Sequence, residues 1–128
     1  MTSSTIHTFR DLLVWQRAMQ MVEEIYKITG SFPREETLGL TNQMRRAAVS
    51  IPSHIAEGKR RGTKKEFTQF LRYAFGSTAE LDTQMEIAKG LHANTVTDFK
   101  KAEALLLEVI KMLSVMTRKE KTSSTKKK

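Results

Sequence analysis

Two long segments with the apolar spacing of helices flank a short basic turn between Leu38 and Glu86, and this arrangement constrains the fold more than any other feature. Before the turn, the apolar line is Leu40, Met44, Ala47, Ala48, Ile51 and Ile55; after it, the line is Phe67, Phe70, Leu71, Ala74, Thr78, Leu81, Met85 and Ala88. Steps of three and four place each line on one face of a helix. Two helices joined by a short turn pack antiparallel, so the segment predicts a helical hairpin.

The limits of this hairpin follow from its turn residues. We expect its first helix to run from Pro33 to about Gly58 and the turn to occupy Gly58 to Gly62. The sequence Thr63-Lys-Lys-Glu66 has the pattern of a capping box, which predicts a helix start. The second helix should end near Lys89-Gly90, where glycine favours a stop.

Pro52 lies inside the first helix of the hairpin. A proline there removes one hydrogen bond and clashes with the carbonyl of Ala48, at a cost of about 3 kcal/mol. Because the apolar spacing stays in phase from Met44 to Ile55, one kinked helix is favoured over two separate helices. The hydroxyl of Ser50 or Ser53 would satisfy a freed backbone group.

Two further helices are predicted outside the hairpin. One runs from Asp11 to Thr29-Gly30, with Gly30 as a left-handed cap. Its apolar line is Leu12, Trp15, Met19, Val22 and Tyr26, and Leu13, Val14, Met21, Ile25 and Ile28 widen that face. The other follows a second capping box, Thr95 to Asp98, with the apolar line Phe99, Ala102, Leu106, Val109, Leu113 and Met116.

The last helix is apolar on nearly every side, because it also carries Leu105, Leu107, Ile110, Met112 and Val115. A broad core face would explain this, but we favour a subunit interface lined by the first and last helices. The fold expected is an all-α, antiparallel, up-down-up-down four-helix bundle over residues 9–116. Residues 1–8 should form a disordered segment and residues 117–128 a basic flexible tail.

The chain carries a net charge of +8, from 22 Lys and Arg against 14 Asp and Glu. The tail contributes +5 of this charge, which is typical of a non-specific contact with polyanions.

The absence of cysteine excludes disulfides and thiolate metal sites. No apolar run is long enough to span a bilayer, and residues 1–8 lack the features of a signal peptide, so we expect a cytoplasmic protein without a membrane partner. Contact of the tail with anionic lipid is a weaker alternative, since no anchor accompanies it.

Catalytic and metal-binding patterns are not found in the sequence. A di-metal bundle needs two Glu-x-x-His motifs and further inward carboxylates, whereas His54 and Glu57 give the reverse order once. His7 and His92 fall in a tail and a turn, and no Walker loop, dinucleotide fingerprint or nucleophile elbow occurs. We therefore expect no enzyme, no metal and no cofactor.

Polar residues also repeat with helical spacing on both helices of the hairpin. They are Gln43, Arg46, Ser50 and Glu57 on the first and Ser77, Glu80 and Gln84 on the second. If the two lines face each other, an ion pair between Arg46 and Glu80 inside the bundle would fix the helix register. Alternatively, both lines are solvated faces. Either way the role is structural.

The basic turn is the strongest candidate for a functional site. It gathers Lys59, Arg60, Arg61, Lys64 and Lys65, and Arg45 and Arg72 would extend it. Lys64 and Lys65 lie in the first helical turn, where cations oppose the dipole and where free amides bind phosphate. A symmetric ring would repeat this patch around one rim and increase its affinity through avidity. The alternative is a solvated basic loop, and base-specific readout is not predicted, since no aromatic residue alternates with the basic ones.

Several segments together resemble the four-helix-bundle proteins of ribosomal-RNA intervening sequences. They are Phe9-Arg-Asp-Leu-Leu-Val-Trp-Gln-Arg-Ala18, Gln43-Met-Arg-Arg-Ala-Ala-Val-Ser-Ile-Pro52, Ile55-Ala-Glu-Gly58 and Phe70-Leu-Arg-Tyr-Ala-Phe-Gly-Ser77 with Ala79-Glu-Leu81. The resemblance implies a bundle that assembles into a homopentameric ring and carries no catalytic residues. The chain is also similar to the accessory protein of diversity-generating retroelements, a basic ring that works with a reverse transcriptase and nucleic acid.

These observations favour a non-enzymatic homo-oligomer that binds structured RNA or DNA through Lys59, Arg60, Arg61, Lys64 and Lys65. The alternative is a scaffold for a polypeptide partner, such as a reverse transcriptase, with the tail as a non-specific polyanion contact.

Overall fold

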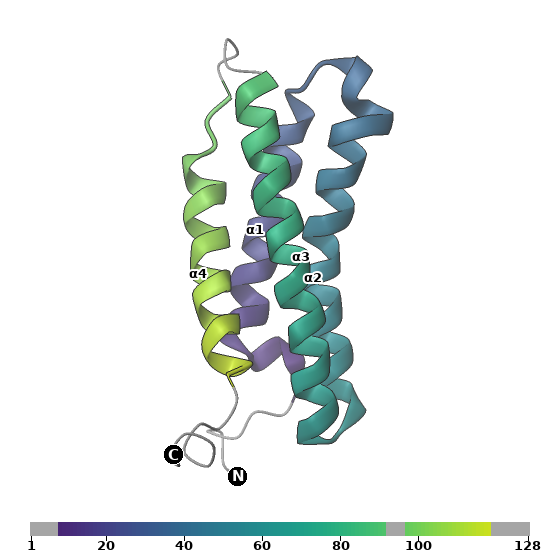
Figure 1. Ribbon diagram of the computed structural model, residues 1–128, viewed down its shortest axis with the longest axis vertical. Helices are drawn as coiled ribbons and strands as arrows, with labels where there is room; N and C mark the ends of the chain where they lie inside the picture. The colour runs from purple at the N-terminus through teal and green to yellow at the C-terminus, as the bar shows by residue number, and fades with distance from the viewer. Residues whose placement is uncertain (1–7, 92–96, 119–128) are drawn as a thin grey trace, which may run out of the picture.

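Four long helices lie side by side in the computed structural model (Figure 1), which describes residues 8–91 and 97–118 apart from the side chains of residues 37 and 38. They are α1 (Leu13–Gly30), α2 (Asn42–Arg61), α3 (Lys64–Leu91) and α4 (Lys100–Met116). Consecutive helices run in opposite directions, and each packs against the helices before and after it, with α4 returning to α1. The expected all-α four-helix protein with bundle packing is confirmed.

The core contains the apolar lines predicted for three of the helices. On α2, Leu40 precedes the helix and Met44, Ala47, Ala48, Ile51 and Ile55 lie within it, all buried. On α3 the buried residues are Leu71, Ala74, Thr78, Leu81, Met85 and Ala88, and on α4 they are Ala102, Leu106, Val109 and Leu113. Apolar spacing therefore identified the inward face of these helices correctly.

The predicted core face of α1 is correct only in part, because most of the residues expected to widen it are buried but most of its main line is not. The residues that face the core are Val14, Ala18, Met21, Ile25 and Ile28, whereas Met19 and Tyr26 of the predicted line are exposed. Trp15 and Val22 are only partly buried against the core. The apolar residues of α1 cover two adjacent faces, and the structure buries the face that contains Ala18, Met21 and Ile25.

The start of α1 differs from the prediction, whereas the helix ends at Gly30 as predicted, although without the expected left-handed cap. Thr8, expected in the disordered segment, begins a 3₁₀ turn (Phe9–Asp11) in which the Thr8 and Asp11 side chains form a capping box. Leu12 is extended and separates this turn from α1, so Asp11 does not start the helix. Gly30 is not left-handed, because Gly62 is the glycine with positive φ among the described residues. Residues 1–7, the rest of the expected disordered segment, lie outside the described part.

The segment before α2 is more irregular than expected. A 3₁₀ turn (Arg34–Glu36) and a π-helical turn (Thr37–Thr41) precede the helix, and Gly39 has non-helical backbone angles. The helix therefore begins at Asn42 rather than at Pro33.

Helix α2 continues through Pro52 as one helix, as predicted. The hydroxyl of Ser53 donates to the carbonyl of Val49 at 2.8 Å and that of Ser50 to the carbonyl of Ala47 at 2.7 Å. These two carbonyls flank that of Ala48, which proline leaves without its helical donor. The serines thus bond to the neighbours of the freed carbonyl.

The turn between α2 and α3 is shorter than expected. Gly58 is buried within α2, and α2 continues to Arg61. Gly62 has φ of 91°, a conformation that suits glycine, and it reverses the chain. Thr63 then caps α3 by accepting a hydrogen bond from the Glu66 amide at 3.1 Å. The Glu66 carboxylate accepts from the Thr63 hydroxyl at 3.3 Å, so the capping box is formed in part.

Helix α4 ends at Met116, as expected, and Thr117 donates its amide to the carbonyl of Leu113. At its start, Asp98 accepts a hydrogen bond from the Lys100 amide at 2.9 Å. Thr95, the other half of the expected capping box, lies outside the described residues, as does the tail beyond Arg118. None of the described helices is long and apolar enough to span a membrane.

Candidate nucleic-acid interface

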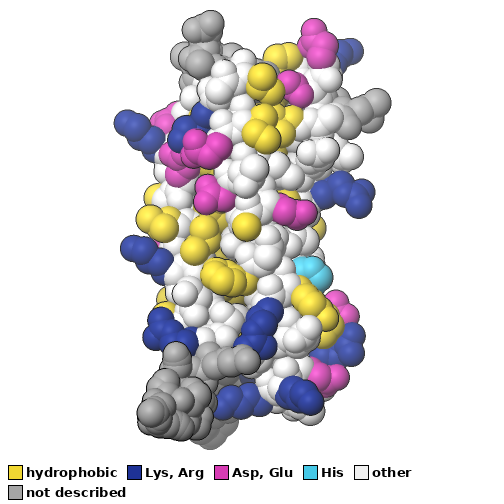
Figure 2. All heavy atoms as spheres, viewed as in Figure 1, with side chains coloured by type: hydrophobic (Ala, Val, Ile, Leu, Met, Phe, Trp, Pro, Cys, Tyr) yellow, Lys and Arg dark blue, Asp and Glu magenta, His cyan; other side chains and the backbone are white. Residues whose placement is uncertain are grey.

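The five cations of the predicted site lie together at one end of the bundle. Lys59, Arg60 and Arg61 form the last turn of α2, and Lys64 and Lys65 form the first turn of α3. Gly62 brings the two turns side by side, and Figure 2 shows Lys and Arg side chains gathered at this end. We call these five residues the basic end.

Three of these cations lie over aromatic rings. The guanidinium of Arg61 is 4.7 Å from the ring centre of Phe70, that of Arg60 is 5.7 Å from Phe9, and the ammonium of Lys59 is 5.7 Å from Phe67. These are cation–π distances, so the rings hold the charges at the surface. The sequence did not reveal this arrangement, because the rings come from the next turn of α3 and from the chain start.

Arg61 is the most restrained of the five. Its guanidinium pairs with Glu57 at 3.0 Å and approaches Glu66 at 3.9 Å. Because two carboxylates share this charge, Arg61 contributes less to the local positive potential than its neighbours. Its position at the negative end of the α2 dipole also suits a cation.

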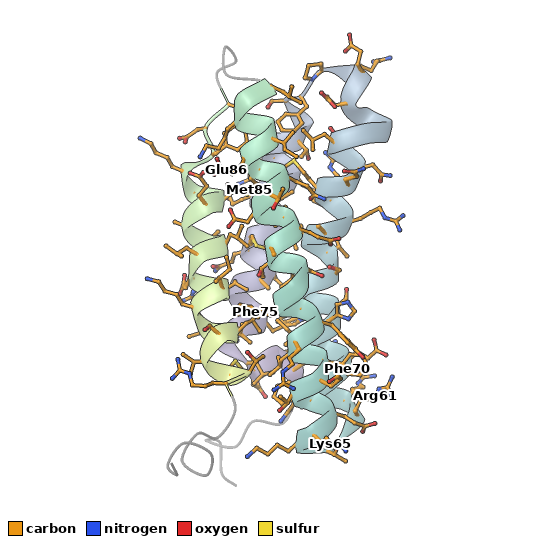
Figure 3. All side chains as sticks on the ribbon, in the orientation of Figure 1. Arg61, Lys65, Phe70, Phe75, Met85 and Glu86 are labelled. Atoms are coloured by element: carbon orange, nitrogen blue, oxygen red, sulfur yellow. The ribbon has the colours of Figure 1, made fainter. Side chains whose placement is uncertain are left out.

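Lys64 and Lys65 contribute charge most directly. Both are exposed, and neither has an ion-pair partner within the described part of the chain. Figure 3 shows Lys65 extending away from the end of the bundle. Both occupy the helix turn where a positive charge is unfavourable. These lysines therefore reduce helix stability while presenting charge to solvent.

Of the two arginines expected to extend the site, one lies at this end and the other does not. Arg72 donates to the carbonyl of Thr117 at 3.3 Å, at the C-terminal end of α4. Arg45 donates to the Thr29 hydroxyl at 2.8 Å and lies 4.3 Å from the ring centre of Tyr26. It precedes Arg61 by about 24 Å of helix rise, so Arg45 belongs to a separate region.

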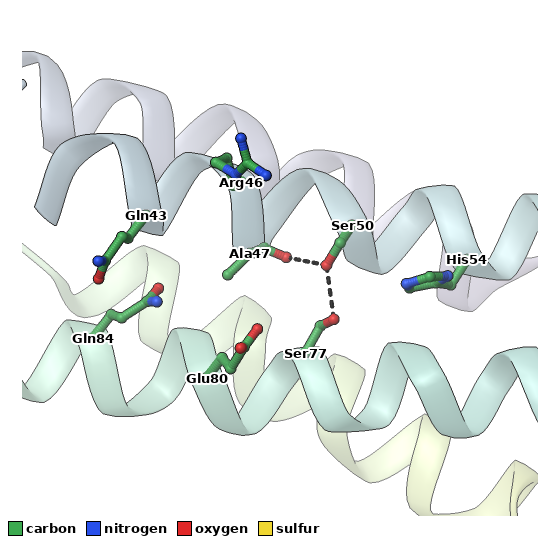
Figure 4. A pocket seen from close by; sticks show the side chains of 8 residues that line it. All are labelled: Gln43, Arg46, Ala47, Ser50, His54, Ser77, Glu80 and Gln84. Atoms are coloured by element: carbon green, nitrogen blue, oxygen red, sulfur yellow. Dashed lines mark hydrogen bonds between the residues drawn. The ribbon is translucent and has the colours of Figure 1, made fainter. Parts of the chain in front are cut away.

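The polar lines of α2 and α3 do face each other, and they line a groove of about 600 Å³. Ser50 and Ser77 are hydrogen-bonded across it at 2.7 Å, as Figure 4 shows. The expected ion pair inside the bundle is not formed: Arg46 and Glu80 are both exposed, and the ion pairs of the described residues do not include them. The polar lines of α2 and α3 are therefore connected by a hydrogen bond between two serines and not by a buried ion pair.

An apolar surface remains uncovered where α1 meets α4. Leu13 is 50% exposed and Val115 60% exposed, and both line a groove of about 500 Å³ with Leu12, Val14, Lys111, Met112 and Met116. We call these residues the α1–α4 face. Leu107 on α4 is also exposed. Of the second apolar set of α4, Leu107 and Val115 therefore lie outside the core of the single chain, whereas Leu105, Ile110 and Met112 are partly buried against it.

Ion pairs connect α4 to its neighbours at the opposite end from the basic residues. Burial opposes ionisation of Glu24, but hydrogen bonds from Lys27 and Lys101 outweigh it and lower the pKa of this carboxyl. The hydrogen bond from Lys89 to Glu103 raises the pKa of Lys89 despite the opposing effect of burial. These contacts join α1 and α3 to α4 and are structural.

The described residues include no cluster of three His or acidic side chains that could hold a metal ion. His54 packs against Phe70 and Tyr73, with ring centres 6.3 and 5.6 Å away.

Together these features define an all-α four-helix protein with a basic end formed by the α2–α3 turn. The chain belongs to the 23S rRNA-intervening sequence protein family, whose profile matches residues 10–115. The resemblance to the proteins of ribosomal-RNA intervening sequences is thereby confirmed.

The fold is also similar to a solved structure, the crystal structure of a protein of unknown function from the S23 ribosomal protein family of Bacteroides thetaiotaomicron. The TM-score is 0.74 at 17% identity, over 84% of this chain and all of that one. At this identity the likeness shows the fold alone. No curated protein matches this chain in sequence.

Proposed function

We propose that this protein is a non-enzymatic homo-oligomer that binds structured RNA or DNA through the basic end. The observation that carries the proposal is the position of Lys64 and Lys65, exposed and without ion-pair partners in the described chain. Cations kept in the turn where they destabilise a helix indicate a role other than folding. Contacts to phosphate would supply that role, since phosphate neutralisation by Lys and Arg dominates nucleic-acid affinity.

Assembly would strengthen this binding. We infer that the α1–α4 face joins copies of the chain, as the resemblance to pentameric rings implies. Each copy would then add one basic end to the same rim, and several weak contacts would act on one nucleic acid. The family description, which refers to 23S rRNA, is compatible with an RNA ligand but identifies none.

A scaffold for a polypeptide partner is the second candidate, and the apolar groove of the α1–α4 face favours it. Such a partner would be captured in a salt-insensitive manner through apolar contact. A reverse transcriptase, as for the retroelement accessory protein, is one partner of this kind.

The nucleic-acid proposal is tested with Lys64→Glu combined with Lys65→Glu. The double variant should bind a labelled structured RNA more weakly, because phosphate contacts are lost. It should also unfold at a higher urea concentration, because acids suit this helix turn. Arg61 is a poorer target, since reversing its charge would leave Glu57 and Glu66 facing a third carboxylate.

Arg34→Glu combined with Lys100→Glu is the matched control. Both residues are exposed at the other end of the bundle, and the change in net charge is the same. Its RNA affinity should remain near that of the wild type. Equal losses in the two double variants would show that total charge, and not the basic end, determines binding.

A further inference from the structure

The groove between α2 and α3 is a candidate site beyond the phosphate contacts. We propose that it accepts the bases of an unpaired nucleic-acid strand whose phosphates lie on the basic end. This inference rests on the proposed function and specifies its ligand class.

The groove adjoins the basic end. His54 lines it and precedes Lys59 on the same helix by about 7.5 Å of helix rise. A strand held at the basic end therefore reaches the groove without crossing another element. In the opposite direction the groove continues along both helices to Gln43 and Gln84, which face each other in Figure 4.

Aromatic rings lie between the basic end and the groove. Tyr73 is 45% exposed, its ring centre is 5.6 Å from that of His54 and 5.1 Å from that of Phe70, and Phe70 lies beneath Arg61. Figure 3 shows Phe70 and Arg61 at neighbouring positions on α3 and α2. An exposed ring beside an arginine is the platform on which unpaired bases stack.

Two residues that line the groove each have a buried polar atom that no described residue hydrogen-bonds. These atoms are Nδ1 of His54 and Oε1 of Gln84. Buried polar atoms of folded proteins are nearly always paired, so each orphan requires an explanation. Both can accept hydrogen bonds, and the amino and imino groups of an unpaired base supply donors.

The charges of the groove select bases rather than phosphates for its interior. The carboxylate of Glu80 lies between Gln84 and Ser77 in Figure 4, where it would repel a phosphate and accept from a base amino group. Arg46, which points away from Glu80, offers a cation at the rim. The groove volume of about 600 Å³ is large enough for single unpaired bases. The bases of a duplex are paired with each other and are therefore not free to enter it.

The test compares a labelled oligouridine with the same oligouridine annealed to its complement, both measured by fluorescence anisotropy with the full-length protein. Tyr73→Leu should weaken single-strand binding about fivefold or more, the loss of one base–aromatic stack, and leave duplex binding unchanged. Tyr73→Phe keeps the ring and should bind as the wild type does. Tyr26→Leu is the matched control, since Tyr26 is 43% exposed on a different face.

Unchanged single-strand affinity in Tyr73→Leu, or an equal loss for both probes, would overturn the inference. The double variant Lys64→Glu with Lys65→Glu distinguishes a failure of the groove inference from a failure of the proposed function. If this double variant binds both probes as tightly as the wild type, the proposed function fails. If it weakens both while Tyr73→Leu weakens neither, only the groove inference fails.

Discussion

At the scale of single residues, glycines show what the sequence can and cannot specify. Gly58 and Gly62 were both predicted to lie in the turn, but only Gly62 has positive φ. Gly58 is needed because a Cβ there would lie 2.5 Å from the Cβ of Phe70 on α3. Phe70 is on the next helix, so the residues around Gly58 do not reveal this contact. The sequence could therefore suggest a turn at Gly58 but not the close approach of α2 and α3.

Gly58→Ala should lower the free energy of unfolding by about 1–3 kcal/mol, because the added methyl group must displace α3. Urea unfolding followed by circular dichroism measures the change. Gly76→Ala is the control, since a Cβ there meets nothing within 4 Å. That substitution should raise stability by about 0.5–1 kcal/mol through helix propensity. A loss in both variants would contradict the role assigned to Gly58.

At the scale of elements, apolar spacing identified the four helices but not every face. On α2 and α3 a single line dominates, and the structure buries most of it. Helix α4 is apolar on nearly every side, and the residues it buries belong to its predicted line. On α1 the apolar residues cover two faces, and only the packing against α2 and α4 determines that Met21 is buried and Met19 exposed. Arg45 was wrongly assigned to the basic end for a different reason, since its distance along α2 from Arg61 places it in a separate region.

The contact between α1 and α4 through Glu24 predicts a pH dependence. Its pKa is lowered in the folded chain, so its contribution to stability is present above the unfolded pKa and is lost as pH falls through the folded value. Urea unfolding of the wild type and Glu24→Gln between about pH 7 and pH 3 measures it. The wild type should lose its advantage over the variant as pH falls, and a constant difference would contradict this.

At the scale of the whole molecule, the bundle leaves the apolar α1–α4 face uncovered and gathers five cations at the basic end. The sequence anticipated both features, because they depend on composition along whole helices. Polar spacing also suggested that the lines of α2 and α3 could face each other, as Ser50 and Ser77 do. The aromatic rings beside the groove were not anticipated, because their position depends on how α2 and α3 pack against each other.

Leu13→Ser combined with Val115→Ser tests whether the α1–α4 face joins subunits. Both side chains are at least half exposed in the single chain, so helicity should be retained. Sedimentation velocity should show a smaller particle than the wild type, because apolar contact area is lost. Ile87→Ser with Leu91→Ser, exposed on α3, should leave the particle size unchanged. An unchanged size in the first variant would place the interface elsewhere.

The central claim is that the basic end, and not the tail, binds nucleic acid. The most direct measurement is the anisotropy of a structured RNA across a salt series, with full-length protein beside a chain ending at Arg118. This end point keeps Thr117, which closes α4 and accepts from Arg72. We predict that binding survives truncation and falls steeply with salt, as phosphate contacts require. Binding that disappears with residues 119–128 would contradict the account and favour the polypeptide scaffold.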